Sequence, residues 1–188
     1  MEKRMTKKVS KYLSLSILAV LTAACSWGSG DDSAGASESI PVIEENPYGA
    51  SDIESPAPDE VILTVRANGR QTTFSLDQLS EFPVTDIRIF EPFIKQNSQF
   101  SGVSMSEIFN ATSISGSDIA TTIALNEYAY SNTADKFIGS NAVIAYEQNG
   151  QPISMDRGGP IRIIFPDGTI LSKVLDAWNW SISEIVVE

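Results

Sequence analysis

The sequence predicts an α+β domain in which short β-strands outnumber a few short helices. Segments rich in β-branched and aromatic residues recur from residue 61 onward, and such residues favour strands. Two Asn-Gly pairs, Asn68-Gly69 and Asn149-Gly150, lie between such segments and favour the positive backbone dihedrals of a tight hairpin turn. Ser-x-x-Gln at 75–78 and Ser-x-x-Glu at 104–107 are typical of helix N-termini. Many short strands with few helices predict a β-rich α+β fold.

In the first half of this domain, strands and short helices are expected to alternate. The expected elements are a hairpin over 61–66 and 71–74, a helix over 75–79, a strand over 84–90, a polar loop over 91–99 and a helix that begins at Ser104 and carries Ile108 and Phe109. The first helix should end before Pro83, because a helix rarely continues into a proline. Glu91-Pro92-Phe93 breaks the alternation of the preceding strand and therefore predicts the loop.

The second half is expected to consist mainly of strands. The expected elements are one long or bent strand over 119–130, a strand over 143–147 paired with 151–154, a buried strand over 161–165 and a closing strand over 180–187. The pairing of 143–147 with 151–154 rests on the Asn149-Gly150 turn between them. The loop Arg157-Gly-Gly-Pro160 separates this hairpin from the buried strand.

The first 24 residues have the order of a secretory signal. Basic residues from Lys3 to Lys11 precede an apolar run over 12–24, which is shorter than the about 20 residues that a membrane-spanning helix needs. The run ends in Leu21-Thr-Ala-Ala-Cys25, which resembles the bacterial lipobox, where cleavage precedes a lipid-bearing cysteine. We therefore expect residues 1–24 to be removed and Cys25 to anchor an exported protein to a membrane, facing the periplasm or the cell exterior. The alternative is an unlipidated secreted form.

Residues 25–60 are predicted to form an acidic, disordered tether that precedes the domain at 61–188. Positions 26–60 hold nine acidic side chains and no basic one, and they are rich in Ser, Gly, Ala and Pro. An acidic docking segment is the alternative interpretation. Residues 1–24 contain five of the 13 basic and one of the 24 acidic residues, so the rest of the chain carries eight basic against 23 acidic side chains, a net charge of −15. Such a charge repels phosphate backbones and argues against a nucleic-acid partner.

The composition excludes several kinds of active site. The chain has no histidine and one cysteine, Cys25. Hydrolysis by a serine or cysteine with a histidine base is therefore excluded in its usual form. A zinc, copper or haem site of ordinary ligand type is excluded for the same reason, and no metal is expected. No P-loop or dinucleotide-binding glycine motif is present.

The C-terminal half resembles a known family. The segments 142–152, 158–166 and 177–185, together with Phe100-Ser-Gly-Val-Ser104 and the helix after it, are similar in order and spacing to the oxidoreductase molybdopterin-binding domain, the sulfite oxidase fold. The resemblance covers nearly all of 61–188 and implies a mixed, barrel-like sheet with a pterin pocket. It is closest to small exported members of the family, some of which are pterin-binding regulators.

This sequence departs from the family at the metal ligand. The resemblance implies that catalytic members bind molybdenum through a cysteine placed shortly after the strand that corresponds to 84–90. Ile89-Phe90-Glu91-Pro92 stands at that place here. The resemblance therefore implies the fold and the pterin pocket. The missing cysteine argues against the redox chemistry of the catalytic members.

The resemblance places the candidate ligand-binding residues in two groups. The first is the loop Arg157, Gly158, Gly159 and Pro160, with Arg162 on the strand that follows. A glycine pair lets the backbone approach a ligand closely, and an arginine fork suits a planar amide edge. An ordinary tight turn with a solvated arginine is the alternative. The second group has side chains that can stack on a flat ring or pair with its edge, unless they are core residues: Phe90, Glu91, Phe93, Tyr128, Tyr130 and Trp178.

These observations predict a binding module. A lipid-anchored domain would hold a pterin-like or molybdopterin-like ligand without a metal and present its loaded state to a membrane-bound signalling protein. The first alternative is a molybdopterin-dependent oxidoreductase or a subunit of a redox complex. The second is an envelope scaffold with a vestigial pocket.

Overall fold

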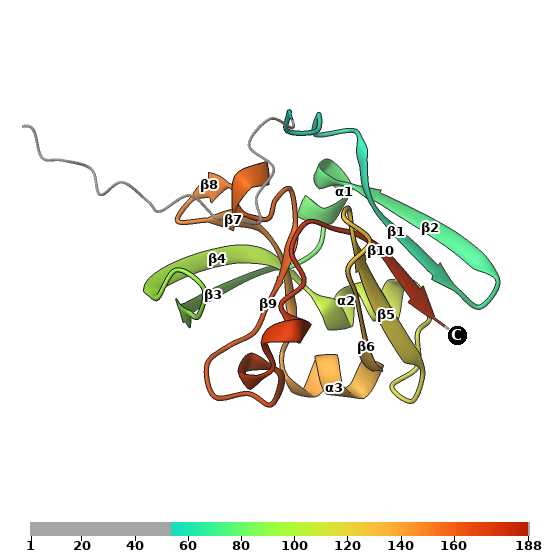
Figure 1. Ribbon diagram of the computed structural model, residues 1–188. Coiled ribbons are helices and arrows are strands. Elements are labelled where there is room, and N and C mark those ends of the chain that lie inside the picture. The colour runs from blue at the N-terminus through green and yellow to red at the C-terminus, as the bar shows by residue number, and fades with distance from the viewer. Residues whose placement is uncertain (1–53, 188) are drawn as a thin grey trace, which may run out of the picture. The chain divides into compact units, whose positions relative to one another are not determined.

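Two β-sheets build the folded domain, which the computed structural model describes over residues 54–187 (Figure 1). The first sheet is mixed and has the strand order β2-β1-β10-β5-β6. Its strands are β1 (Val61–Ala67), β2 (Arg70–Ser75), β5 (Ile119–Ala124), β6 (Ala129–Thr133) and β10 (Ile182–Val187). β1 and β10 run parallel, so the first and last strands of the domain lie side by side. The predicted signal peptide, Cys25 and most of the predicted tether lie outside the described residues.

The second sheet is antiparallel. Its strands are β3 (Val84–Glu91), β4 (Gln96–Ser104), β7 (Val143–Gln148), β8 (Gln151–Pro152) and β9 (Arg162–Ile164). The order is β3-β4-β7-β8, and β9 pairs with β7. β4 and β7 therefore lie between Glu91, at the end of β3, and Arg162, at the start of β9.

The helices of the domain are short. They are α1 (Leu76–Ser80), α2 (Met105–Ala111), α3 (Ala134–Gly139) and the 3-10 helices η1 (Met155–Arg157), η2 (Leu171–Lys173) and η3 (Leu175–Ala177). Within the described residues, no helix has the length and apolar character needed to cross a membrane. The predicted β-rich α+β fold is confirmed, with two sheets in place of one barrel-like sheet.

Local sequence signals explain the elements that were predicted correctly. Asn68 and Gly69 have φ of 54° and 70°, the dihedrals that close the β1–β2 hairpin. The Ser75 hydroxyl accepts a hydrogen bond from the Gln78 N–H, and the Gln78 side chain accepts one from the Ser75 N–H, which makes the predicted capping box at α1. The second box is incomplete, because the Ser104 hydroxyl accepts from the Ser106 N–H.

The predicted polar loop over 91–99 is wrong, because β4 begins at Gln96. Residues 92–95 form a turn between β3 and β4, in which the Lys95 N–H donates to the Glu91 carbonyl at 2.9 Å and Lys95 has φ of 54°. Ser98 and Phe100 are buried, while Asn97 and Gln99 beside them on β4 are exposed. The start of this strand is polar because one of its faces is in solvent.

The predicted single strand over 119–130 is also wrong, because a turn divides it into β5 and β6. Residues 125–128 form the turn, with Glu127 at φ of 66° and the Ala124 N–H bonded to the Tyr128 carbonyl. No helix is expected from the sequence over 134–139, but α3 forms there and buries Ala134 and Phe137.

One hydrophobic core joins the two sheets. Leu63 and Ile185 from the first sheet and Phe100 and Ile144 from the second are fully buried in it. Full burial of such a side chain contributes about 1.5–3 kcal/mol. The core fixes the ends of β3 and β5 and the segment before β10, which contribute walls of the candidate site.

Candidate functional site

A pocket of about 590 Å³ opens where several loops meet. Four aromatic side chains line it: Phe93, Tyr128, Trp178 and Trp180. The other lining residues are Leu125, Asn126, Met155, Gly158, Leu175, Asp176, Asn179 and Ser181. Its size falls in the range of about 300–1,000 Å³ that is typical of small-molecule sites.

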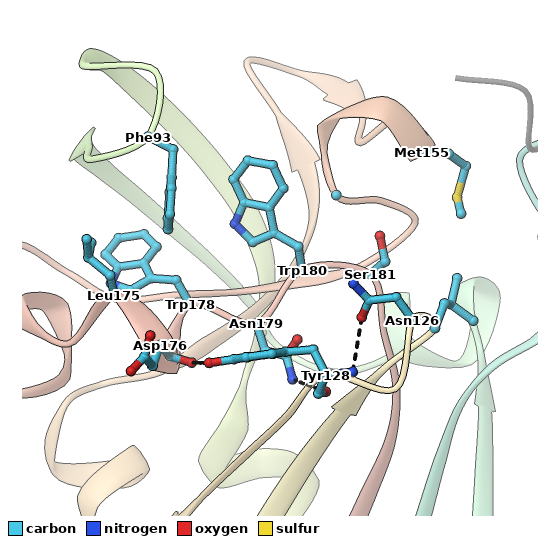
Figure 2. Close-up of a pocket in the computed structure, with 12 residues that line it drawn as sticks. Phe93, Asn126, Tyr128, Met155, Leu175, Asp176, Trp178, Asn179, Trp180 and Ser181 are labelled. Carbon is cyan, nitrogen blue, oxygen red and sulfur yellow. Dashed lines mark hydrogen bonds between the residues drawn. The ribbon is translucent and has the colours of Figure 1, made fainter. Parts of the chain in front are cut away.

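Each wall comes from a segment at the end of a regular element (Figure 2). Phe93 lies in the β3–β4 turn and Tyr128 in the β5–β6 turn. The 178–181 segment, between η3 and β10, contributes both tryptophans. Loops held by a rigid scaffold often carry binding residues, and these loops are held by both sheets.

The aromatic rings pack edge to face around the pocket. The Phe93 centroid lies 5.0 Å from that of Trp180 and 6.2 Å from that of Trp178. Trp178 also packs on Phe165 at 5.6 Å, and its indole N–H donates to the Ser172 carbonyl at 3.3 Å. Trp178 is therefore fixed in the core, whereas Phe93 is 41% exposed. These rings form walls suited to stacking on a flat molecule.

A hydrogen bond joins two of the segments that line the pocket. The Tyr128 hydroxyl donates to the Asp176 backbone carbonyl at 3.0 Å and so links the β5–β6 turn to η3 (Figure 2). Burial, and next the charge of Asp176, raise the pKa of Tyr128. The lining residues, all within the described part of the chain, include one carboxylate and neither lysine nor arginine. The pocket therefore offers no cation to an anionic ligand.

Behind Trp180 lies a buried ion pair between Arg162 and Glu91. The Arg162 Nη2 atom lies 2.8 Å from Glu91 Oε1, and both side chains are 1% exposed. Gln148 donates to the other Glu91 oxygen at 3.2 Å and to Ser98 Oγ at 3.1 Å. Burial lowers the pKa of Arg162, and the adjacent Glu91 carboxylate opposes that shift.

Arg162 supports the pocket wall from behind. Its guanidinium carbon lies 4.0 Å from the centroid of the Trp180 ring, a stacked cation–π geometry. Its Nη1 donates to the Arg157 carbonyl at 3.1 Å, which ties β9 to η1. The charged groups of Arg162 and Glu91 thus bind each other and neighbouring groups, and neither residue lines the pocket.

The glycine pair lets η1 approach Trp180. Gly158 has φ of 82°, and a Cβ there would lie 2.8 Å from the Trp180 ring. A Cβ on Gly159 would lie 1.9 Å from the Ile153 carbonyl oxygen. Of the predicted loop, Gly158 lines the aromatic pocket and Pro160 lines a neighbouring one. Arg157 is half-buried beside Gly158, and it is not among the residues that line the aromatic pocket.

The structure therefore brings together four of the residues singled out from the sequence: Phe93, Tyr128, Trp178 and Gly158. Phe90 is 51% exposed and lies outside the lining, and its N–H donates to the Asp167 carboxylate. Tyr130 packs on Phe137 at 6.0 Å.

Sequence reasoning missed much of the pocket. The missed lining residues are Leu125, Asn126, Met155, Leu175, Asp176, Asn179, Trp180 and Ser181. The spacing of Trp178 and Trp180 just before the last strand was the available signal, because alternate residues of an extended segment share one face.

The residues fit a flat heterocycle better than a complete molybdenum cofactor. No group of three or more His, Cys, Asp or Glu side chains gathers within residues 54–187, and this stretch contains neither cysteine nor histidine. It therefore lacks the thiolate that the family resemblance requires for molybdenum. The pocket also lacks a cation for a phosphate, while its aromatic walls suit a pterin ring.

Comparisons with known proteins agree with the resemblance in the sequence. The family model described as "oxidoreductase molybdopterin binding domain" matches residues 49–179. A solved structure, the sulfane dehydrogenase SoxCD from Paracoccus pantotrophus, is similar in fold with a TM-score of 0.57 at 13% identity. The alignment covers 71% of this chain and 39% of that chain. A comparison with curated proteins finds no match. Because the family model spans most of the chain, the protein belongs to the oxidoreductase molybdopterin binding domain family.

Proposed function

We propose that the aromatic pocket binds a flat, pterin-like small molecule and that the protein is a binding module without catalytic activity of its own. One observation carries the proposal. The turn that follows Glu91, where the family resemblance places the metal-binding cysteine, delivers Phe93 into a pocket of about 590 Å³ walled by two tryptophans. Glu91, which stands at the place of that cysteine, pairs with Arg162, and the turn after it supplies an aromatic wall.

The chemistry of the walls supports a ring-shaped ligand. Phe93 is 41% exposed and can stack on a flat heterocycle, while Leu125, Met155 and Leu175 exclude water from its edges. The absence of lysine and arginine from these walls disfavours a ligand that depends on its phosphate for affinity.

The N-terminal sequence supports a role for this binding at a membrane. Cleavage before Cys25 and lipidation of that residue would hold the domain at a membrane, facing the periplasm or the cell exterior, at the end of an acidic tether. In that position the domain would present its loaded state to a membrane-bound signalling protein.

The family assignment favours a second candidate, a molybdopterin-dependent oxidoreductase or a subunit of a redox complex. This candidate needs a metal ligand other than cysteine or histidine within the domain.

One experiment separates the two candidates. The mature protein is purified from cells, and bound pterin is sought by fluorescence and mass spectrometry while molybdenum is measured by elemental analysis. A pterin without molybdenum supports the binding module, and about one molybdenum per chain favours the enzyme. If nothing copurifies, pterins are titrated into the protein and tryptophan fluorescence is followed, because Trp178 and Trp180 line the pocket. Absence of any fluorescence change and of any heat of binding would overturn the proposal.

A further inference from the structure

We propose that Asn179 and Trp180 read the edge of the ligand ring, so that the pocket selects a heterocycle with a cyclic amide, which offers an N–H donor and a carbonyl acceptor. This inference rests on the proposed function, because it concerns the same pocket. It names the chemical feature of the ligand that the aromatic walls alone do not specify.

Asn179 is a buried amide with one unused oxygen. The side chain is 1% exposed and lines the pocket. Its Nδ2 donates to the Thr122 carbonyl at 3.0 Å, to Thr122 Oγ1 at 3.2 Å and to the Tyr128 carbonyl at 3.4 Å. Carbonyl oxygens can only accept, so these contacts fix which end of the amide is the nitrogen. The Oδ1 atom is left without a partner within the described part of the chain.

Trp180 supplies the complementary unused group. Its indole Nε1–H is buried and has no acceptor among residues 54–187, although the residue lines the same pocket. The ring itself is held in place by Arg162 on one side and by the edge contact with Phe93. Buried polar groups in proteins are nearly always paired, so an acceptor and a donor left unpaired in one pocket indicate that the ligand completes them.

A cyclic amide matches this pair. Its ring N–H can donate to Asn179 Oδ1, and a ring carbonyl can accept from Trp180 Nε1–H. A ligand that lacks the N–H leaves the Asn179 oxygen buried and unpaired, which weakens binding. The pocket thus discriminates by hydrogen bonding as well as by shape.

Asn126 is a matched control within the same pocket. It is exposed, and its Oδ1 already accepts a hydrogen bond from the Tyr128 N–H at 3.1 Å (Figure 2). Replacing it removes the same side-chain type from the same lining without removing an unused buried acceptor.

The test compares lumazine with 1,3-dimethyllumazine, which keeps the flat ring and both carbonyls but has no ring N–H. Dissociation constants are measured by calorimetry on the mature protein at mildly acidic pH, so that the lumazine N–H groups stay protonated. The parent should bind lumazine at least about tenfold more tightly, which corresponds to about 1.4 kcal/mol. Asn179→Ala should weaken lumazine binding by about that factor and leave dimethyllumazine nearly unchanged, while Asn126→Ala keeps the preference.

If Asn179→Ala does not fold, a Trp180 variant and the ligand preference of the parent protein still test the inference. Trp180→Phe keeps an aromatic ring but removes the N–H together with the five-membered part of the indole, so it should weaken both lumazines to a similar extent. Equal binding of the two ligands by the parent would overturn the inference while leaving the proposed pocket intact. Binding of neither ligand would instead count against the proposed function. An Asn126→Ala variant that loses the preference as fully as Asn179→Ala would also overturn the assignment of Asn179.

Discussion

The buried ion pair between Glu91 and Arg162 gives the sharpest prediction about stability. Replacing Glu91 with alanine leaves the Arg162 guanidinium 1% exposed without its counter-ion, and it also removes the acceptor used by Gln148. Loss of one partner of a buried pair typically costs about 3–5 kcal/mol, because a charge is then buried and unpaired. A domain of this size has a total stability of about 5–15 kcal/mol, so the variant should fold but unfold much more easily.

The assay is urea unfolding at neutral pH, with the slope of the transition compared between variants. The matched control is Glu184→Ala, which removes the partner of Arg66 at the surface, where the two side chains are 23% and 51% exposed. A pair in which one side chain is half exposed to solvent contributes about 0–1 kcal/mol. We expect Glu91→Ala to lower the unfolding free energy several times more than Glu184→Ala at similar slopes. A loss below about 1 kcal/mol for Glu91→Ala would refute the reasoning.

Three further predictions concern the pocket and the anchor. Gly158→Ala places a Cβ 2.8 Å from the Trp180 ring, at a residue with φ of 82°. The variant should therefore lower the unfolding free energy by about 1–3 kcal/mol and weaken ligand binding. Unfolding and titration curves that overlay those of the parent would contradict this. The pKa of Tyr128 is higher in the folded state than in the unfolded state. The neutral Tyr128 hydroxyl therefore contributes its full share of the folding stability below pH 10, the ordinary tyrosine pKa, and that share is lost as the pH rises further. Tyr128→Phe should therefore flatten the alkaline fall in melting temperature, and an unchanged fall would argue against the effect. Cys25→Ala should abolish labelling by a fatty-acid analogue, whereas equal labelling of variant and parent would exclude this anchor.

Local signals explain why much of the fold could be predicted. The Asn68-Gly69 turn and the Ser75 capping box each depend on a few adjacent residues, and both form as expected. The start of β4 was missed because its burial alternates on a largely polar segment. The β5–β6 turn was missed because it contains no glycine or proline and depends on Glu127 adopting a positive φ.

The candidate site was only partly predictable, because its key relations are distant in sequence. Glu91 and Arg162 are 71 residues apart, and each was interpreted separately as a ligand-binding group. Their mutual pairing depends on β4 and β7 lying between β3 and β9, which no local pattern shows. No sequence motif points to Asn179. Its Oδ1 atom is left without a partner because its Nδ2 group bonds to Thr122 and Tyr128, which are distant in sequence.

The parallel pairing of β1 with β10 brings the chain that leads into β1 close to the candidate pocket. Both strands begin at the same end of their sheet, because they run parallel. Residues 54–57 lie just before β1, and residues 178–181, which line the aromatic pocket, lie just before β10. Residues 54–57 line a second pocket with Ile182 and Ser183, and this pocket shares Leu125 and Met155 with the aromatic one. A pull on the chain before β1 would therefore act next to Leu125 and Met155, two side chains that also line the aromatic pocket.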